Sequence, residues 1–217
     1  EGETRKVIMQ APKNGFFYVL DRTNGELISA EPFSTVTWAS HVDLETGRPV
    51  ETGEGEYGDR TAFVLPSANG AHNWHPMAFS PETGLVYIPT QDIAGIYSLS
   101  EQWKEKGEFT PKKNWWNTGI DWTDYIDAIN ALPEIPMEKG YLKAWDPATG
   151  EVKWQAEYPA PLNGGVLATA GNLVFQGTAD GYFHAFKADT GERVWSQRIQ
   201  TGIVAAPVTY MVDGEQY

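Results

Sequence analysis

The stretch Gly140-Tyr-Leu-Lys-Ala-Trp-Asp-Pro-Ala-Thr-Gly-Glu-Val-Lys-Trp154 returns 41 residues later as Gly181-Tyr-Phe-His-Ala-Phe-Lys-Ala-Asp-Thr-Gly-Glu-Arg-Val-Trp195. A third copy, without the final Trp, is Gly15-Phe-Phe-Tyr-Val-Leu-Asp-Arg-Thr-Asn-Gly-Glu-Leu-Ile28. Each copy contains a strand, a Thr-Gly or Asn-Gly turn and a second strand, and a repeat of about 40 residues of this kind is typical of a β-propeller. The sequence therefore predicts an all-β arc of about three four-stranded antiparallel blades.

Three copies are too few to close a ring of blades. We therefore expect residues 1–217 to form one partial propeller domain taken from a longer chain, with an insertion at about residues 93–138. Such an arc exposes unpaired strand edges and apolar faces that further blades would cover. A piece that assembles with copies of itself is an alternative, which the mass in solution would reveal.

The strands are expected where apolar segments lie between turn residues. Residues 30–70 are expected to be an extended connection, and Asp121–Ala131, inside the aromatic-rich insertion, is expected to be a short helix. The predicted strands are Lys6–Gln10, Phe16–Asp21, Glu26–Ser29, Ala71–Ser80, Leu85–Thr90, Gly140–Asp146, Glu151–Ala156, Gly164–Thr169, Leu173–Thr178, Gly181–Lys187, Glu192–Gln197 and Val204–Tyr210.

Composition excludes several classes of function. The formal net charge is −13, without the basic surface that nucleic acids and anionic membranes require. No apolar stretch approaches the ~20 residues that span a bilayer. The absence of Cys excludes thiolate ligands, catalytic thiols and disulfides within these residues.

Two kinds of residue recur with the repeat and are expected to be structural. Trp154 and Trp195 occupy the same repeat position, where large aromatic side chains fill the wedge between neighbouring blades. Asp21, Asp146 and Asp189 recur at turns, which indicates turn capping rather than catalysis, because a catalytic carboxylate would be singular.

Other polar residues occur once, at points that a propeller brings near its central channel. Lys13 has no counterpart in the other copies, and Asn73-Trp74 and Leu162-Asn163 precede predicted innermost strands. His72 and His75 are interpreted as a hydrogen-bonded structural pair in preference to a metal site, because a metal would need further ligands.

Four segments closely resemble the quinoprotein alcohol dehydrogenases, which use pyrroloquinoline quinone (PQQ). They are Met9-Gln-Ala-Pro-Lys-Asn-Gly-Phe-Phe-Tyr-Val-Leu-Asp-Arg22, His72-Asn-Trp-His-Pro-Met-Ala78, Asn163-Gly-Gly-Val-Leu-Ala-Thr-Ala-Gly-Asn-Leu-Val-Phe-Gln-Gly-Thr-Ala-Asp-Gly181 and Gly202-Ile-Val-Ala-Ala-Pro-Val-Thr-Tyr210. The resemblance implies an eight-bladed propeller with tryptophan-docking motifs, PQQ and Ca²⁺ in the axial channel, and a periplasmic location.

The resemblance also assigns roles by position. Lys13 matches the basic residue that hydrogen-bonds the quinone oxygens and assists hydride transfer. Asn73 matches an amide that contacts PQQ, with Trp74 beside it as a wall of the pocket. Asn163 stands where some relatives carry a Trp against the cofactor, and Leu162 is its neighbour.

The rest of the family's site is expected elsewhere. The resemblance puts the catalytic Asp before Glu1, and the Ca²⁺ ligands and a possible haem c domain outside residues 1–217. The first hypothesis is therefore part of a PQQ-dependent dehydrogenase that oxidises alcohols and passes electrons to a cytochrome, inactive without the remaining blades. The alternative is a non-catalytic propeller scaffold, like the outer-membrane assembly lipoproteins that reuse the repeat without a cofactor.

Overall fold

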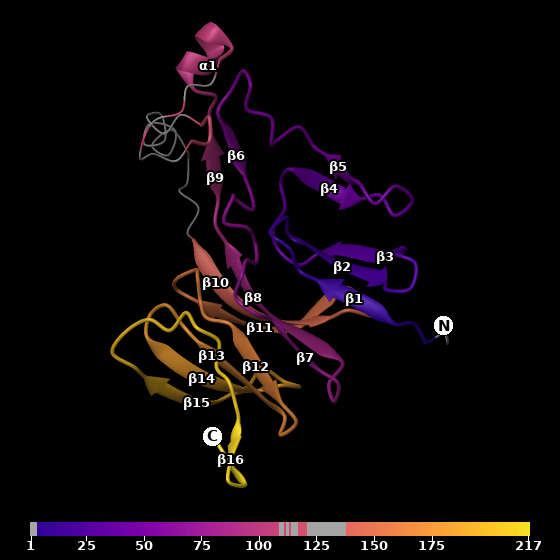
Figure 1. Cartoon of the computed structure of the whole chain (residues 1–217), viewed down its shortest axis with the longest axis vertical. Coiled ribbons are helices and arrows are strands. Elements are labelled where there is room, and N and C mark those ends of the chain that lie inside the picture. Colours follow the sequence, from indigo (N-terminus) through magenta and orange to yellow (C-terminus); the bar gives the residue numbers. More distant parts are fainter. Residues whose placement is uncertain (1–3, 109–110, 112, 114–116, 121–137) are drawn as a thin grey trace.

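Three antiparallel sheets follow one another along the chain, as the repeat predicts (Figure 1). The computed structural model describes residues 4–108, 111, 113, 117–120 and 138–217. The first sheet contains β1 (Val7–Gln10), β2 (Phe16–Asp21) and β3 (Leu27–Pro32). The turn after β2 is capped by Asp21, whose carboxylate accepts hydrogen bonds from the backbone N–H and the hydroxyl of Thr23.

The second sheet joins strands that lie far apart in the sequence. Its order is β11-β10-β8-β7, with β7 (Ala78–Ser80), β8 (Leu85–Asp92), β10 (Lys139–Asp146) and β11 (Glu151–Tyr158). The antiparallel pairing of β8 with β10 joins two segments that are separated by residues 93–138. The Asp146 carboxylate caps the β10–β11 turn by accepting from the backbone N–H of Ala148 at 2.9 Å.

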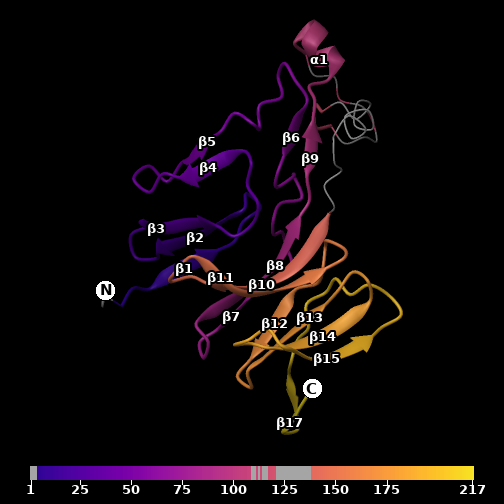
Figure 2. The same cartoon turned by 180° about the vertical axis from the view of Figure 1, so that it is seen from behind.

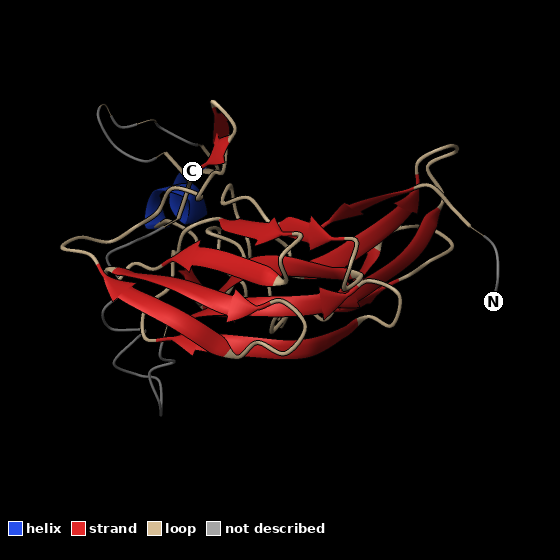
Figure 3. Cartoon of the chain, turned by 90° about the horizontal axis from the view of Figure 1, so that it is seen from below, coloured by secondary structure: helices blue, strands red, loops and turns tan. Residues whose placement is uncertain are grey.

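The third sheet is a regular four-stranded blade. It contains β12 (Val166–Thr169), β13 (Leu173–Gly177), β14 (Tyr182–Lys187) and β15 (Arg193–Arg198), in that order. Asp189, in the β14–β15 turn, differs from the other two repeated Asp residues, since the bond described there is its backbone N–H donating to Asn172 Oδ1. Figure 2 shows the sheets from behind, one above another, and Figure 3 shows the strands from below.

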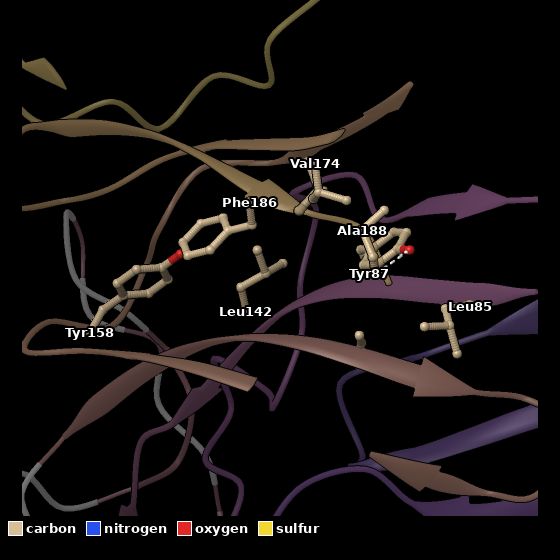
Figure 4. Packing of buried hydrophobic residues seen from close by; sticks show 9 residues of the cluster. Leu85, Tyr87, Leu142, Tyr158, Val174, Phe186 and Ala188 are labelled. Atoms are coloured by element: carbon tan, nitrogen blue, oxygen red, sulfur yellow. Dashed lines mark hydrogen bonds between the residues drawn. The ribbon is translucent and has the colours of Figure 1, made fainter. Parts of the chain in front are cut away.

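Apolar side chains pack between the sheets. Tyr87 of β8 is fully buried, and its hydroxyl donates to the carbonyl of Ala188 beyond β14 at 2.9 Å (Figure 4). Trp154 of β11 donates from Nε1 to the same carbonyl and stacks on Phe186 with the ring centroids 6.1 Å apart. Trp154 therefore fills the wedge between the second and third sheets, as its repeat position predicts. The ring of Trp195 instead contacts Phe183 within its own sheet and is 46% exposed.

The long connection between β3 and β7 is more structured than expected. The prediction of a plain extended segment at residues 30–70 is wrong, because β4 (Ala39–Val42) pairs with β5 (Pro49–Glu51), and β6 (Ala62–Val64) pairs with β9 (Gly95–Tyr97). The partner of β6 lies more than thirty residues further along the chain, so local sequence does not reveal the pairing.

Two strand predictions differ from the structure, and one helix prediction falls outside the described residues. A strand over Ala71–Ser80 is wrong except at residues 78–80, because the buried His72 and the turn around it take up the preceding residues. Val204–Tyr210 is not a strand either; a hairpin of β16 (Met211–Val212) and β17 (Glu215–Gln216) forms just after it. The short helix α1 (Glu101–Lys106) was not expected, and the helix predicted at Asp121–Ala131 lies outside the described residues.

Candidate functional site

Lys13 lies in the turn between β1 and β2 and is joined to the segment that leads to β7. Its Nζ donates to the carbonyl of Ala68 at 3.0 Å, and its own carbonyl accepts from the backbone N–H of Ala71 at 3.0 Å. Gly70, at φ +80°, makes this approach possible, since a Cβ there would lie 2.5 Å from Cγ of Lys13. The turn at residues 68–71 therefore cradles the stem of an exposed ammonium group.

His72 holds the same two segments together from the buried side. Its Nδ1 lies 2.5 Å from the carbonyl oxygen of Ala11, and its Nε2 lies 2.6 Å from the carbonyl oxygen of His75. The ring of His72 therefore bridges the backbone of the β1–β2 turn and the backbone of the segment that leads to β7. The predicted hydrogen-bonded pair is confirmed. Within the part of the chain that the structure describes, no group of three His, Asp or Glu could hold a metal ion.

Asn73 and Trp74 lie on the surface of this turn. The amide Nδ2 of Asn73 donates to the carbonyl of Asn69 at 3.0 Å. Trp74 is 66% exposed, and its ring stacks on that of His75 at 4.0 Å. Burial, and then the charge of His72, lower the pKa of His75 below its usual value. A neutral His75 therefore supports an exposed, flat indole beside the Lys13 cradle.

Gln91, at the end of β8, connects this turn to the segment before β12. Its Nε2 donates to the carbonyl of Gly70 at 2.9 Å, and its Oε1 accepts from the backbone N–H of Leu162 at 3.2 Å. The residue is only 4% exposed. Sequence reasoning missed Gln91, because a single Gln in a strand gives no signal of partners that lie 21 and 71 residues away.

Leu162 and Asn163 differ in what they present. Leu162 is 44% exposed, at φ 60°, whereas Asn163 is 4% exposed. Both ends of the Asn163 amide bind backbone, with Nδ2 donating to the carbonyl of Ala160 at 2.9 Å and Oδ1 accepting from the N–H of Ala179 at 3.0 Å. Asn163 thus fixes two loops to each other. A direct contact between its side chain and a cofactor stays a prediction.

The structure therefore links four of the five candidate residues through hydrogen-bonded loops. Lys13 and Asn73 both bind the 68–70 turn, Trp74 follows directly, and Gln91 connects the turn to Leu162. The fifth, Asn163, is buried and joins the backbone of Ala160 to that of Ala179.

Comparison with known proteins identifies the fold and the family. A family model described as "Glucose/ethanol/alcohol dehydrogenase, beta-propeller domain" (PQQ) matches residues 156–217. The whole chain is 52% identical to quinohemoprotein alcohol dehydrogenase ADH IIB of Pseudomonas putida and 48% identical to quinohemoprotein alcohol dehydrogenase of Comamonas testosteroni, covering 30% of each relative. The chain belongs to the propeller family of the PQQ-dependent quinohaemoprotein alcohol dehydrogenases.

Solved structures of this family have the same fold. The crystal structure of the Comamonas testosteroni enzyme superimposes with a TM-score of 0.85 at 47% identity, over 98% of this chain and 31% of that chain. A europium-containing methanol dehydrogenase superimposes with a TM-score of 0.81 at 30% identity, over 99% of this chain and 36% of that one. The arc of antiparallel sheets is thus part of a quinoprotein propeller, and the chain spans about 30% of the length of its curated relatives.

Among the helices of the described residues, none is both long and apolar enough to cross a membrane.

Proposed function

We propose that this chain forms one side of the active site of a PQQ-dependent dehydrogenase that oxidises alcohols. The observation that carries the proposal is the cradled ammonium of Lys13, which shares the 68–70 turn with Asn73. The family supplies the context, since relatives identical at 52% and 48% over the whole chain are quinohaemoprotein alcohol dehydrogenases. The activity, substrates and partners of the whole protein are part of this proposal.

The chemistry of the exposed side chains fits a planar, anionic quinone. An ammonium group has three N–H donors, and among the described residues the Ala68 carbonyl takes one from Lys13. The remaining donors suit carbonyl and carboxylate oxygens, and the amide of Asn73 offers a further polar contact. The exposed ring of Trp74 offers a flat surface against which a fused aromatic system can stack. On these grounds Lys13, Asn73 and Trp74 would hold PQQ, with Leu162 at the edge of the site.

When bound, PQQ supplies an electrophilic quinone carbonyl that accepts a hydride from the alcohol carbon. The contribution of Lys13 is electrostatic, because a fixed positive charge beside an oxygen stabilises negative charge that develops there. The hydrogen bond to Ala68 holds that charge in position before any substrate binds. Lys13 is therefore the catalytic residue of this segment in our proposal.

Other parts of the reaction are proposed for residues outside this segment. They include the Asp that takes the proton of the alcohol, the ligands of Ca²⁺ and a haem c group. A relative from Thauera butanivorans is named 1-butanol dehydrogenase (cytochrome c), which supports a cytochrome as the electron acceptor. We propose a periplasmic location on the family resemblance.

The experiment is reconstitution of the full-length protein with PQQ and Ca²⁺, followed by ethanol-dependent reduction of an artificial electron acceptor. Lys13→Ala should lower kcat about a hundredfold or more, as loss of a donor to a developing charge does. Lys187→Ala, which removes an exposed Lys paired with Glu192 on the third sheet, serves as the matched control. Equal turnover in wild type and Lys13→Ala would remove Lys13 from the mechanism. Failure of the wild type to bind PQQ would favour the non-catalytic scaffold.

A further inference from the structure

A cavity of about 490 Å³ opens beside Lys13, and its walls come from the β1–β2 turn, the 33–77 connection and β9. The walls are mostly apolar and include the rings of Trp38, Tyr57 and Tyr97. Pockets for small organic molecules have volumes of about 300–1,000 Å³ and are lined mainly by apolar and aromatic side chains. The cavity therefore has the size and lining of a ligand site, and it is far larger than ethanol requires.

The aromatic walls are fixed by hydrogen bonds to backbone. The Tyr97 hydroxyl accepts from the N–H of Ala68 at 2.7 Å, and the indole Nε1 of Trp38 donates to the carbonyl of Asn14 at 3.3 Å. Tyr57 lies against Tyr97 with the ring centroids 5.7 Å apart. The indole N–H of Trp38 is therefore bound to the protein, and the hydrogen bond to Ala68 fixes the ring of Tyr97 in the cavity wall.

Lys13 is linked directly to this aromatic wall. Its Nζ binds the carbonyl of Ala68, while Tyr97 binds the N–H of the same residue. The proposed hydride-transfer end of the site and the aromatic cavity thus share one anchoring residue. A molecule whose reacting carbon lies near Lys13 could extend its remaining atoms into the cavity.

The charge at the rim selects among such molecules. Glu51 and Glu56 line the cavity and are exposed, and Lys13 is the single basic residue that lines it within the described part of the chain. Two carboxylates at the entrance repel anions, and the repulsion weakens as salt is added. The rim therefore disfavours a tail that carries a carboxylate.

We propose that this cavity binds the tail of the alcohol substrate, and that it favours neutral alcohols with an aromatic or cyclic tail over short-chain and anionic ones. The inference rests on the proposed function, since it assigns the substrate class of the same site. The residues that determine this preference are Trp38, Tyr57 and Tyr97 in the walls and Glu51 and Glu56 at the rim.

The first test compares benzyl alcohol with ethanol in the reconstituted full-length protein. Tyr57→Ala should raise KM for benzyl alcohol about tenfold and by a much smaller factor for ethanol, because only the aromatic tail reaches the ring. Leu44→Ala, which removes an exposed apolar side chain outside the cavity, should leave both KM values at their wild-type level. An equal effect of Tyr57→Ala on both alcohols, or no effect on either, would overturn the inference while the proposed function stands.

The rim is tested with 4-(hydroxymethyl)benzoate. The double variant Glu51→Gln/Glu56→Gln should raise kcat/KM for this anion several-fold at low ionic strength, with little change for benzyl alcohol, and added salt should reduce the difference. If wild type and double variant had the same kcat/KM for 4-(hydroxymethyl)benzoate at low ionic strength, the proposed repulsion of anions by Glu51 and Glu56 would be wrong.

A binding measurement separates this inference from the proposed function. Saturation-transfer NMR with benzyl alcohol, recorded without an electron acceptor, needs no turnover. If no alcohol is oxidised but benzyl alcohol binds the wild type and not Tyr57→Ala, the proposed function fails and the cavity is retained as an aromatic-ligand site. If benzyl alcohol does not bind the wild type, the inference is wrong, whatever the activity.

Discussion

The side-chain oxygen of Gln91 accepts a hydrogen bond from the backbone N–H of Leu162, 3.2 Å away and 71 residues further along the chain. The same side chain donates to the carbonyl of Gly70 at 2.9 Å, in the turn that cradles Lys13. One buried amide thus sets the spacing between the connection that leads to the second sheet and the connection that leads to the third. The position of the proposed quinone-binding surface depends on this interior group as well as on the exposed residues.

Replacing Gln91 with Leu should destabilise the protein by about 1–3 kcal/mol, because the carbonyl of the buried Gly70 and the backbone N–H of Leu162 lose their hydrogen-bond partner. It should also weaken PQQ binding, since the loops that carry Lys13 and Leu162 are no longer fixed. Thermal melting and equilibrium PQQ binding measure the two effects. Gln197→Leu, a change on the exposed β15 strand, is the matched control. A stable variant with wild-type PQQ affinity would contradict this role of Gln91.

His72→Gln tests the bridge that the ring of His72 makes between two backbone segments. A Gln side chain carries both of its polar atoms at one end, so it cannot reach the carbonyls of Ala11 and His75 on opposite sides at once. We expect a loss of about 1–3 kcal/mol of stability. Thermal melting of wild type and variant measures this loss. An unchanged melting temperature in His72→Gln would contradict the bridging role of His72.

Trp154→Ala tests the contact between the second and third sheets. The change removes the hydrogen bond to Ala188 and the ring contacts with Tyr87 and Phe186. The expected cost is below the ~3–5 kcal/mol that is typical for a large aromatic side chain buried in a core, because Trp154 is only partly buried. Trp103→Ala, on the exposed surface of α1, should shift the melting temperature little. Similar melting temperatures for the two variants would contradict the importance of this wedge.

The pH dependence of stability follows from His184 of β14. Burial, and next the charge of Arg193, lower the pKa of His184 below its usual value of about 6.5. The unfolded chain therefore binds the proton more readily than the folded one. The contribution of the neutral His184 to the free energy of unfolding is fully present above pH ~6.5 and is lost as the pH drops below that value. His184→Phe should reduce the slope of stability against pH in that window, measured by melting at pH 5 to 7.5. An unchanged slope would contradict this contribution.

A structural feature could be predicted from the sequence when the residues that form it lie close together along the chain. The repeat predicted β2, the strands of the third sheet and the turn roles of Asp21 and Asp146, because each depends on residues close in sequence. It also led to Lys13 and Asn73, through positions that break the repeat. The pairing of β6 with β9 and the bonds of Gln91 join distant segments, and no local pattern reveals them.

Asn163 shows the converse limit. Its position before an innermost strand favoured a side chain that faces the central channel, yet its amide binds the backbone of Ala160 and Ala179. The sequence correctly predicted that Asn163 precedes the first strand of the third sheet, but it did not predict the direction of the Asn163 side chain. That direction depends on Gly140, where a Cβ would clash with the Asn163 amide.

The ammonium group of Lys13, held by the carbonyl of Ala68, is the central ligand of the quinone in the proposed site. The direct measurement is a spectrophotometric titration of the metal-loaded full-length protein with PQQ, comparing wild type, Lys13→Ala and Asn73→Ala. We predict tight binding with a shifted quinone absorbance in the wild type, and affinity at least tenfold weaker in each variant. Identical titration curves and spectra for all three proteins would contradict the account.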